Sequence, residues 1–207
     1  METGKKLLII GAGGHGKVIA DIAMKLGRYE KIAFLDDDEQ IVSIMGCERE
    51  GTIEKLSQES KDTEIFVAIG NSTVRQKICT QVKQLGFFMP ILIHPNAIVG
   101  KEVSLGGGTV VMAGAVINSG VKVGEGVIIN TSSSVDHDCE VGDFAHIAVG
   151  AHIAGTVFIG KHDWIGAGAI VSNNLSIVDH VLIGAGAVVV KNIEEAGTYI
   201  GVPAKKR

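Results

Sequence analysis

The sequence predicts two domains: an α/β domain over residues 1–94 and an all-β solenoid over residues 95–207. Two observations support this prediction. A period of six residues runs without interruption from Val99 to Glu194, and a glycine-rich turn near the start of the chain separates an apolar run from a helical pattern. A short fixed period indicates repeat units that stack into one continuous core. A strand, turn and helix in succession indicate an α/β layer.

The solenoid prediction depends on the aliphatic residue that opens each hexad. Stepping by six from Val99 meets sixteen aliphatic residues: Val99, Leu105, Val111, Ile117, Val123, Ile129, Val135, Val141, Ile147, Ile153, Ile159, Ile165, Val171, Ile177, Ile183 and Val189. The fourth residue after each is mostly small or aliphatic, so each short strand has two inward residues, and Asp163 interrupts that pattern. Glycine often follows the aliphatic residue, as at Gly100 and Gly106, and we expect these glycines to form corners because glycine tolerates positive φ.

The α/β domain begins with an apolar strand, Leu7–Ile10, that leads into the glycine-rich turn Gly11–Gly16. A helical pattern from Val18 to Gly27 follows. The glycines at 11, 13 and 16 match G-x-G-x-x-G, a turn whose N–H groups favour phosphate oxygens at the helix N-terminus. The alternative interpretation is a turn that serves only close packing of strand on helix.

A second strand, Lys31–Leu35, ends in the acidic residues Asp36 and Asp37. An acid about twenty residues beyond the last glycine is where a ribose contact is expected. A buried strand over Glu64–Ile69 ends at Gly70, which should lie beside the first turn because ligands gather at the carboxyl ends of parallel strands. The turn, the acids and Gly70 together predict a nucleotide site.

The remaining segments complete a small Rossmann-like domain. Residues 40–64 are polar and loop-like, with a short helix expected from Ile53. A helix is predicted from Thr73 to Gly86 and a strand over 88–93, before a hinge at His94-Pro95. A full dinucleotide fold needs two such halves, so a mononucleotide, such as the nucleotide half of a sugar donor, fits this length better than NAD.

Composition argues against several other classes of protein. The net charge is −4 and the pI is near 6.0, whereas nucleic-acid binding normally needs a basic stripe. No run of eighteen apolar residues is present, so no membrane span is expected, and the apolar stretch after Met1–Lys6 is too short for a signal peptide. Three scattered cysteines predict no disulfide frame and no zinc site. We therefore expect a cytoplasmic protein without a metal.

One window of the solenoid concentrates chemically active side chains around His137. Residues 130–140 read Asn-Thr-Ser-Ser-Ser-Val-Asp-His-Asp-Cys-Glu, which places four hydroxyl groups and three acids near this histidine. A histidine beside a carboxylate is suited to act as a general base, with one ring nitrogen held by the acid and the other free to take a proton. The alternative is an ordinary surface histidine. In the hexad frame His146, His152, His162 and His180 also avoid the inward positions, so we expect them to face solvent or a neighbouring subunit, with His162 and His180 stacked on consecutive coils.

Five segments together resemble one known family. They are Gly-Ala-Gly-Gly-His-Gly at 11–16, Leu-Asp-Asp at 35–37, Ala-Ile-Gly-Asn at 68–71, Asn-Thr-Ser-Ser at 130–133 and Gly-Val-Pro-Ala-Lys at 201–205. The sequence resembles the bacterial sugar acetyltransferases of the sialic-acid O-acetyltransferase and UDP-4-amino-sugar N-acetyltransferase type. That resemblance implies a left-handed parallel β-helix with three hexads per coil, acetyl-CoA as co-substrate, a nucleotide-sugar substrate and a homotrimer. It also implies a C-terminal tail that could cap the last coil.

The resemblance also implies roles for particular residues. His137 matches the family's base, and the acid after it, Asp138, matches the residue that raises its basicity, although Asp136 remains an alternative partner. Substrate-binding positions correspond to Gly13, Gly14, His15, Asp36, Asp37 and Gly70. Contacts to acetyl-CoA correspond to His146, Ala167 and Ala185.

The expected activity is therefore transfer of an acetyl group to the 4-amino group of a UDP-linked amino-deoxy sugar. An O-acetyltransferase acting on sialic acid or another sugar is the nearest alternative, and a non-catalytic nucleotide-sugar-binding protein is the alternative of another class. A zinc hydratase of the γ-carbonic-anhydrase type is a further alternative, because His146 and His152 are six residues apart and fall on adjacent sides. That family's histidine spacing is not matched here.

Overall fold

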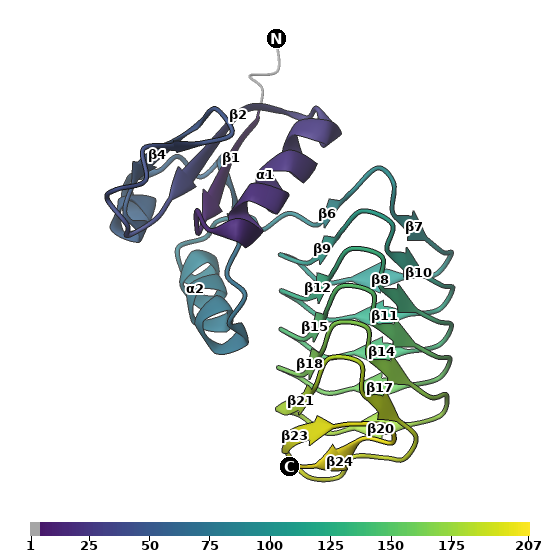
Figure 1. Cartoon of the computed structure of the whole chain (residues 1–207). Helices are drawn as coiled ribbons and strands as arrows, with labels where there is room; N and C mark the ends of the chain where they lie inside the picture. The colour runs from purple at the N-terminus through teal and green to yellow at the C-terminus, as the bar shows by residue number, and fades with distance from the viewer. Residues whose placement is uncertain (1–4) are drawn as a thin grey trace. The chain divides into compact units, whose positions relative to one another are not determined.

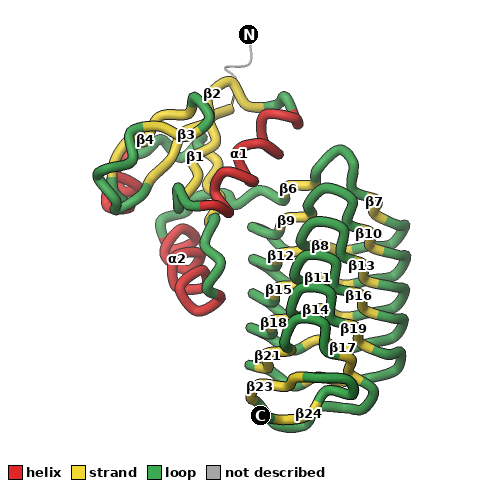
Figure 2. Tube along the Cα trace, viewed as in Figure 1, coloured by secondary structure: helices red, strands yellow, loops and turns green. Residues whose placement is uncertain are grey.

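The computed structural model describes residues 5–207 and divides them into two compact units, one ending at Pro95 and the other being Asn96–Arg207. Residues 1–4, which belong to the segment tested for a signal peptide, lie outside the described chain. Figure 1 shows an α/β unit and a stack of triangular coils, and Figure 2 shows how little of each coil is strand. The predicted fold class, a Rossmann-like α/β domain followed by a left-handed parallel β-helix, is confirmed.

The α/β unit is built on a five-stranded sheet with the order β3-β4-β2-β1-β5. Its elements are β1 (Lys5–Ile10), α1 (Gly14–Leu26), β2 (Tyr29–Leu35), β3 (Ser43–Ile44), β4 (Cys47–Gly51), the 3₁₀ helix η1 (Ile53–Gln58), β5 (Glu64–Val67), α2 (Ser72–Gln84) and β6 (Leu92–Ile93). Strand β1 pairs in parallel with both β2 and β5, so the carboxyl ends of these three strands share one edge. Each helix ends near a glycine with positive φ, Gly27 after α1 and Gly86 after α2.

Two predicted segments of this unit differ from the structure. Residues 40–51, expected as a loop, contain a hairpin in which β3 pairs antiparallel with β4 through Met45 and Gly46, both at positive φ. A two-residue hairpin turn with positive φ at both positions matches the twist of the strands, and its first residue is usually Asn, Asp or Gly. Met45 occupies that position here, so the sequence does not indicate the turn. The expected strand over 88–93 is reduced to β6 because Pro90 lacks an N–H and interrupts pairing.

The second unit is a prism with three walls of parallel strands. The first wall contains β7 (Ile98–Val99), β10 (Val116–Ile117), β13 (Ser134–Val135), β16 (His152–Ile153), β19 (Ile170–Val171) and β22 (Val188–Val189). The second wall contains β8 (Ser104–Leu105), β11 (Lys122–Val123), β14 (Glu140–Val141), β17 (Phe158–Ile159) and β20 (Ser176–Ile177). The third wall runs through β9 (Val110–Val111), β12 (Ile128–Ile129), β15 (His146–Ile147), β18 (Trp164–Ile165), β21 (Val181–Ile183), β23 (Gly197–Ile200) and β24 (Lys205–Lys206).

Residues eighteen apart stack directly between coils. In the first wall, Ile117 pairs with Val135, and Val135 pairs with Ile153. The aliphatic residues that open the hexads fill the interior, and Ile117, Ile147 and Ile165 are fully buried. One hexad period therefore produces both the walls and the core, because each strand contributes the same two inward positions.

The glycine corners expected from the sequence are not where the structure turns. The seven glycines that follow the aliphatic residue do not have positive φ; a Cβ on Gly106 would lie 2.5 Å from the backbone nitrogen of Glu125 on the next coil, so these glycines allow close approach between coils. The left-handed corner is two residues later. It is occupied at every sixth position by Glu102, Gly108, Gly114, Gly120, Gly126, Ser132, Asp138, Phe144, Gly150, Thr156, His162, Gly168, Asn174, His180 and Gly186.

The C-terminal segment covers the open end of all three walls. Strand β23 pairs with β21 in the third wall, Ile193 bridges Ile177 in the second, and Gly201 and Ala204 bond to Val188 in the first. An unpaired strand edge invites association with other chains, so the tail caps the prism as the sequence predicted. Within residues 5–207, no helix is both long and apolar enough to cross a membrane.

Candidate active site

His137 lies at the corner between the first and second walls, just after β13. Its ring nitrogen Nδ1 is 2.9 Å from Oδ2 of Asp138, and 58% of its side chain is exposed. Asp138 occupies the left-handed corner with φ of 57°. Aspartate is one of the few residues that adopt this conformation readily, so the turn brings the carboxylate back toward the preceding ring.

Asp136 has a different role from Asp138. Its Oδ1 accepts hydrogen bonds from the backbone N–H of His137 at 2.8 Å and from Nδ2 of Asn118 at 2.6 Å. These bonds hold the pKa of Asp136 below its usual value, so this carboxylate stays ionised. Of the two acids that the sequence left open, Asp138 contacts the imidazole, whereas Asp136 holds the backbone of the corner.

The electrostatics make His137 a stronger base than a free histidine. The hydrogen bond to Asp138 raises the pKa of the His137 imidazole, and the charges of Asp136 and Asp138 act in the same direction, against a smaller lowering by desolvation. Because Nδ1 donates its proton to the carboxylate, Nε2 is the nitrogen that can accept one. The corner therefore presents an exposed, oriented proton acceptor.

The remaining polar residues of the window do not converge on His137. Ser133 is buried, and its hydroxyl donates to the carbonyl of Asn130. Glu140 pairs with Lys122 on the second wall at 2.9 Å. Ser134 faces outward on the first wall, where its Oγ lies 2.8 Å from Nδ1 of His152. Only two of the three acids thus surround the ring.

His146 corrects the expectation that this histidine faces solvent or a neighbouring subunit. It begins β15 on the third wall and is buried, with its ring 4.4 Å from that of Trp164. Its Nε2 lies 2.9 Å from Nδ2 of Asn130. By contrast, the predicted stacking of His162 on His180 is confirmed, with ring centroids 4.9 Å apart and planes 5° from parallel.

Ala167 and Ala185 lie on a different corner from His137. Each follows a strand of the third wall, β18 or β21, and precedes one of the first wall, so they occupy the corner between those walls. They are exposed and eighteen residues apart, and therefore stack on consecutive coils. The whole first wall separates this corner from that of His137, so one chain does not bring the two together.

In the α/β unit, the glycines of the first turn divide into two groups. Gly11 is required by its backbone conformation, with φ of 103°. Gly16 is required by packing, because a Cβ on it would lie 2.1 Å from the carbonyl oxygen of Gly11. Gly13 and Gly14 have no atom within 4 Å of a built Cβ and are exposed at the N-terminus of α1. The turn therefore leaves open space where backbone N–H groups favour an anion.

The acids after β2 border this turn. Oδ2 of Asp36 accepts the backbone N–H of Ala12 at 2.6 Å, and Oδ1 accepts that of Asp38 at 2.9 Å. Asp37 is more exposed, with Oδ1 3.3 Å from the backbone nitrogen of Ile53. A cavity of about 130 Å³ at this edge is lined by Ile10, Gly11, Leu35, Asp36, Asp37, Ile53, Ile69 and Ile78.

His15 and Gly70 are linked to this edge through a buried arginine. Nη1 of Arg75 donates to the carbonyls of Ile69 and Gly70, both at 2.8 Å, and so fixes the segment after β5. Burial, with the nearby Arg75 cation, lowers the pKa of His15 to about 4. His15 is therefore neutral at physiological pH and can take part in hydrogen bonds without adding charge.

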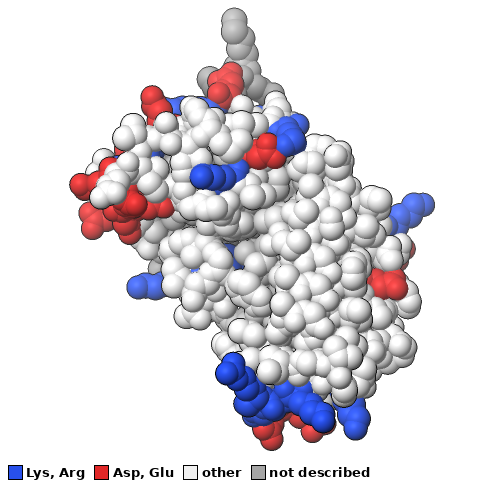
Figure 3. All heavy atoms as spheres, viewed as in Figure 1, with Lys and Arg blue, Asp and Glu red and all other residues white. Residues whose placement is uncertain are grey.

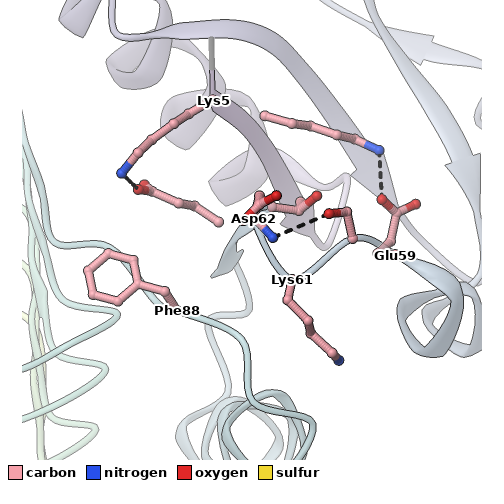
Figure 4. Close-up of a pocket in the computed structure, with 9 residues that line it drawn as sticks. Lys5, Glu59, Lys61, Asp62 and Phe88 are labelled. Carbon is pink, nitrogen blue, oxygen red and sulfur yellow. Dashed lines mark hydrogen bonds and ion pairs between the residues drawn. The ribbon is translucent and has the colours of Figure 1, made fainter. Parts of the chain in front are cut away.

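A cavity of about 690 Å³ lies at the opposite ends of β1 and β5 (Figure 4). Four of its charged side chains are paired: Lys5 with Glu64 at 2.7 Å and Lys6 with Glu59 at 2.9 Å. The nucleotide positions predicted from the sequence are not among its lining residues. Size alone therefore does not identify the ligand site of this unit.

The site also contains residues that the sequence analysis did not select. Asn118, which bonds Asp136, lies eighteen residues before it, and Gly155, which underlies His137, lies eighteen residues after that histidine. Applying the coil period to the window would have found both. Among residues 5–207 no group of three histidine, cysteine or acidic side chains is arranged to hold a metal ion, and His146 and His152 stand on adjacent walls with partners of their own.

Comparison with known proteins gives one family match and several close structures. Residues 6–82 match the PglD N-terminal domain. The UDP-N-acetylbacillosamine N-acetyltransferase of Bacillus subtilis strain 168 is 32% identical over 114 residues, which are 53% of this chain and 52% of that protein. The matched stretch thus spans about half the length of this curated relative.

Two solved structures extend the likeness to nearly the whole chain. The acetyltransferase domain of PglB from Neisseria gonorrhoeae FA1090 is 44% identical, covers 98% of this chain and 99% of that one, and superposes with a TM-score of 0.95. It has also been solved with acetyl coenzyme A. PerB from Caulobacter crescentus, solved with CoA and GDP-perosamine, is 36% identical, covers 97% of this chain and 96% of that one, and gives a TM-score of 0.91.

Proposed function

The chain belongs to the bacterial family of nucleotide-sugar and sialic-acid acetyltransferases built on the left-handed β-helix, and we propose that it transfers acetyl from acetyl-CoA to an amino group of a nucleotide-linked sugar. The finer proposal is the 4-amino group of a UDP-linked amino-deoxy sugar in bacterial glycan synthesis. The observation that carries the proposal is the exposed His137–Asp138 pair, with Nδ1 and Oδ2 2.9 Å apart.

The chemistry assigns one proton transfer to His137. The sugar amine attacks the thioester carbonyl carbon while Nε2 removes a proton from the amine nitrogen. The resulting tetrahedral oxyanion is stabilised by N–H donors. The C–S bond then breaks, and the thiolate of CoA takes the proton from the imidazolium. The products are an acetamide and CoA thiol, so no covalent enzyme intermediate is required.

The α/β unit is proposed to hold the nucleotide part of the substrate. Gly13 and Gly14 leave open space at the N-terminus of α1, where phosphate oxygens are favoured. Asp37 is the more available acid for a ribose hydroxyl, since both oxygens of Asp36 already accept backbone N–H groups. His15 and Gly70 border the same edge and complete the proposed set.

Acetyl-CoA is proposed to lie along the corner that carries Ala167 and Ala185, with His146 on the adjoining wall. That corner leads toward the C-terminal end of the prism, where lysine and arginine gather over β24 (Figure 3). Phosphate groups of CoA would be attracted to such a basic end. A relative of the same fold has been solved with acetyl coenzyme A, which supports this cofactor assignment.

We propose a homotrimer because the two parts of the reaction lie on different corners of one chain. Between them stands the first wall, whose outward residues Ile98 and Ile170 are 64% and 44% exposed. Apolar side chains of this size favour burial against another protein surface. Packing this wall against a neighbour would bring His137 of one subunit to the Ala167–Ala185 corner of another.

The test measures thiol release from acetyl-CoA in the presence of UDP-, GDP- and CMP-linked sugars. An N-acetyltransferase gives one thiol per sugar and a product that gains one acetyl group and resists hydroxylamine. A product cleaved by hydroxylamine would instead be an ester and would favour the O-acetyltransferase alternative. A nucleotide sugar that raises the melting temperature without any thiol release would favour a non-catalytic binding protein.

A further inference from the structure

We propose that Gly155 is a positioning residue for His137, because only a residue without a Cβ leaves room for the imidazole and keeps Nε2 accessible. This inference rests on the proposed function of His137 as the base. Gly155 lies eighteen residues after His137 and therefore directly below it on the next coil. It is buried, although the histidine above it is largely exposed.

The distances show how closely the ring lies over this glycine. A Cβ built on Gly155 would be 2.5 Å from Nε2, 2.7 Å from Cε1 and 3.1 Å from Cδ2 of His137. Carbon atoms in proteins do not approach a nitrogen or carbon this closely without displacement. The nearest atom is Nε2, the nitrogen assigned to accept the substrate proton, so a methyl group would displace the ring or cover its reactive side.

Backbone conformation does not explain this glycine. The positive-φ positions of the prism recur every six residues and include Thr156, but Gly155 is not among them. The three atoms nearest to a Cβ here all belong to the His137 ring. At Gly142, by contrast, the nearest atoms are backbone atoms of Gly160 and Lys161, 2.7 Å away. At Gly155 the obstacle is the end of a movable side chain, so a substitution should cost little stability.

The groups that hold the ring in place are few. Asp138 bonds Nδ1, Asp136 bonds the backbone nitrogen, and these two acids are the charged groups that act on the imidazole. A ring displaced from Gly155 pivots about its Cβ and moves Nδ1 away from Asp138. The same displacement removes the carboxylate that favours the protonated imidazole, so the basicity and the orientation of His137 change together.

The test uses Gly155→Ala in the full chain, with Gly86→Ala as the control. Gly86 follows α2, outside the proposed sites, and a built Cβ there meets nothing within 4 Å. We expect Gly155→Ala to lower kcat by roughly 10- to 100-fold with little change in the KM of acetyl-CoA, since small misplacements of a catalytic group cost this much. Gly86→Ala should keep kcat, although its positive φ costs some thermal stability.

Two further measurements separate positioning from other roles. NMR titration should show the pKa of the His137 ring falling in Gly155→Ala; an unchanged pKa and unchanged ring shifts would overturn the proposal, whatever reaction the protein catalyses. In the His137→Ala background, Gly155→Ala should have no further effect on turnover. A loss that persists there would assign Gly155 a role independent of His137 and would likewise overturn the proposal. If His137→Ala itself retains full turnover, the proposed role of His137 as the base fails, while the titration still decides whether Gly155 seats the ring.

Discussion

The carboxylate of Asp138 lies 2.9 Å from Nδ1 of His137 because Asp138 occupies a left-handed corner of the coil, with φ of 57°. The fourteen other corners at this register hold residues from glycine to phenylalanine, so the conformation belongs to the fold rather than to this acid. An ordinary structural turn thus supplies the orientation that a general base requires.

Replacing the imidazole tests its assignment as base. His137→Ala should lower kcat by ~10²–10⁴, the usual range for loss of a general base, with the KM of acetyl-CoA nearly unchanged. His180→Asn is the control, because His180 is also an exposed prism histidine and asparagine tolerates its positive φ. Steady-state thiol release measures both. Near-normal turnover in His137→Ala would remove this residue from the mechanism.

The acid beside the ring should set the pH dependence. The hydrogen bond to Asp138 raises the pKa of His137, and a base must be neutral to act, so activity rises as pH increases through that raised pKa. Asp138→Asn should move this acidic limb to lower pH and reduce the plateau rate. Asparagine accepts the left-handed corner, so the fold is retained. A profile of kcat/KM whose limb does not move would contradict the role of Asp138.

Hybrid oligomers should show whether the site is shared between subunits. His137→Ala and Ala185→Trp are each expected to be inactive, the first through the base and the second by blocking the proposed CoA corner. When the two variants are unfolded and refolded together in equal amounts, random assembly should restore about one quarter of wild-type activity. A working site then needs an intact His137 from one subunit and an intact CoA corner from its neighbour. Separately refolded variants are the control. No recovery on mixing would place the whole site within one chain.

Asp36 should matter for the nucleotide half of the substrate alone. Asp36→Ala removes the carboxylate that accepts the N–H of Ala12, which loosens the glycine turn, and we expect about tenfold weaker binding of the nucleotide sugar, on the order of a lost charged hydrogen bond. Calorimetric titration measures this affinity, and the KM of acetyl-CoA should stay constant. The exposed neighbour Glu39, changed to glutamine, is the control. An equal effect of both changes would indicate general electrostatics.

Buried Asp163 predicts how the prism responds to pH. Its Oδ1 accepts a hydrogen bond from the backbone N–H of Val181, and its Oδ2 accepts one from the backbone N–H of Gly160. Thr109 and Cys139 occupy the same inward position of their hexads, and each also accepts the backbone N–H of the residue eighteen positions ahead. Burial raises the pKa of Asp163 from 3.8 to about 8, despite these bonds. Between pH 3.8 and about pH 8, Asp163 is protonated in the folded state but ionised in the unfolded state. The free energy of unfolding therefore decreases as pH rises through this range.

The melting temperature should therefore fall between about pH 5 and about pH 8 in the wild type and much less in Asp163→Asn, whose side chain does not titrate. Asp62→Asn, at an exposed acid, should keep the wild-type dependence. Thermal unfolding followed at several pH values measures this difference. A wild-type melting temperature that rises over the same range would reverse the assignment.

The sequence by itself determined the coil. An aliphatic residue at every sixth position is a local regularity that predicts short strands stacked around one core. The resemblance added three hexads per coil, and in the structure Ile117, Val135 and Ile153 stack at that spacing of eighteen residues. The glycine turn between strand and helix determined the second unit in the same way. The position of His137 beside two acids was also readable, since neighbours in sequence remain neighbours in space.

Only the tertiary structure decided which groups act together. The choice of Asp138 over Asp136 depends on a backbone dihedral that no residue type specifies, because fifteen different corners share it. The burial of His146 depends on Trp164, one coil away, and the place of the imidazole depends on Gly155, which the chain reaches only after a full turn. Contacts between coils arise from stacking distance, and that distance exists only once the prism has formed.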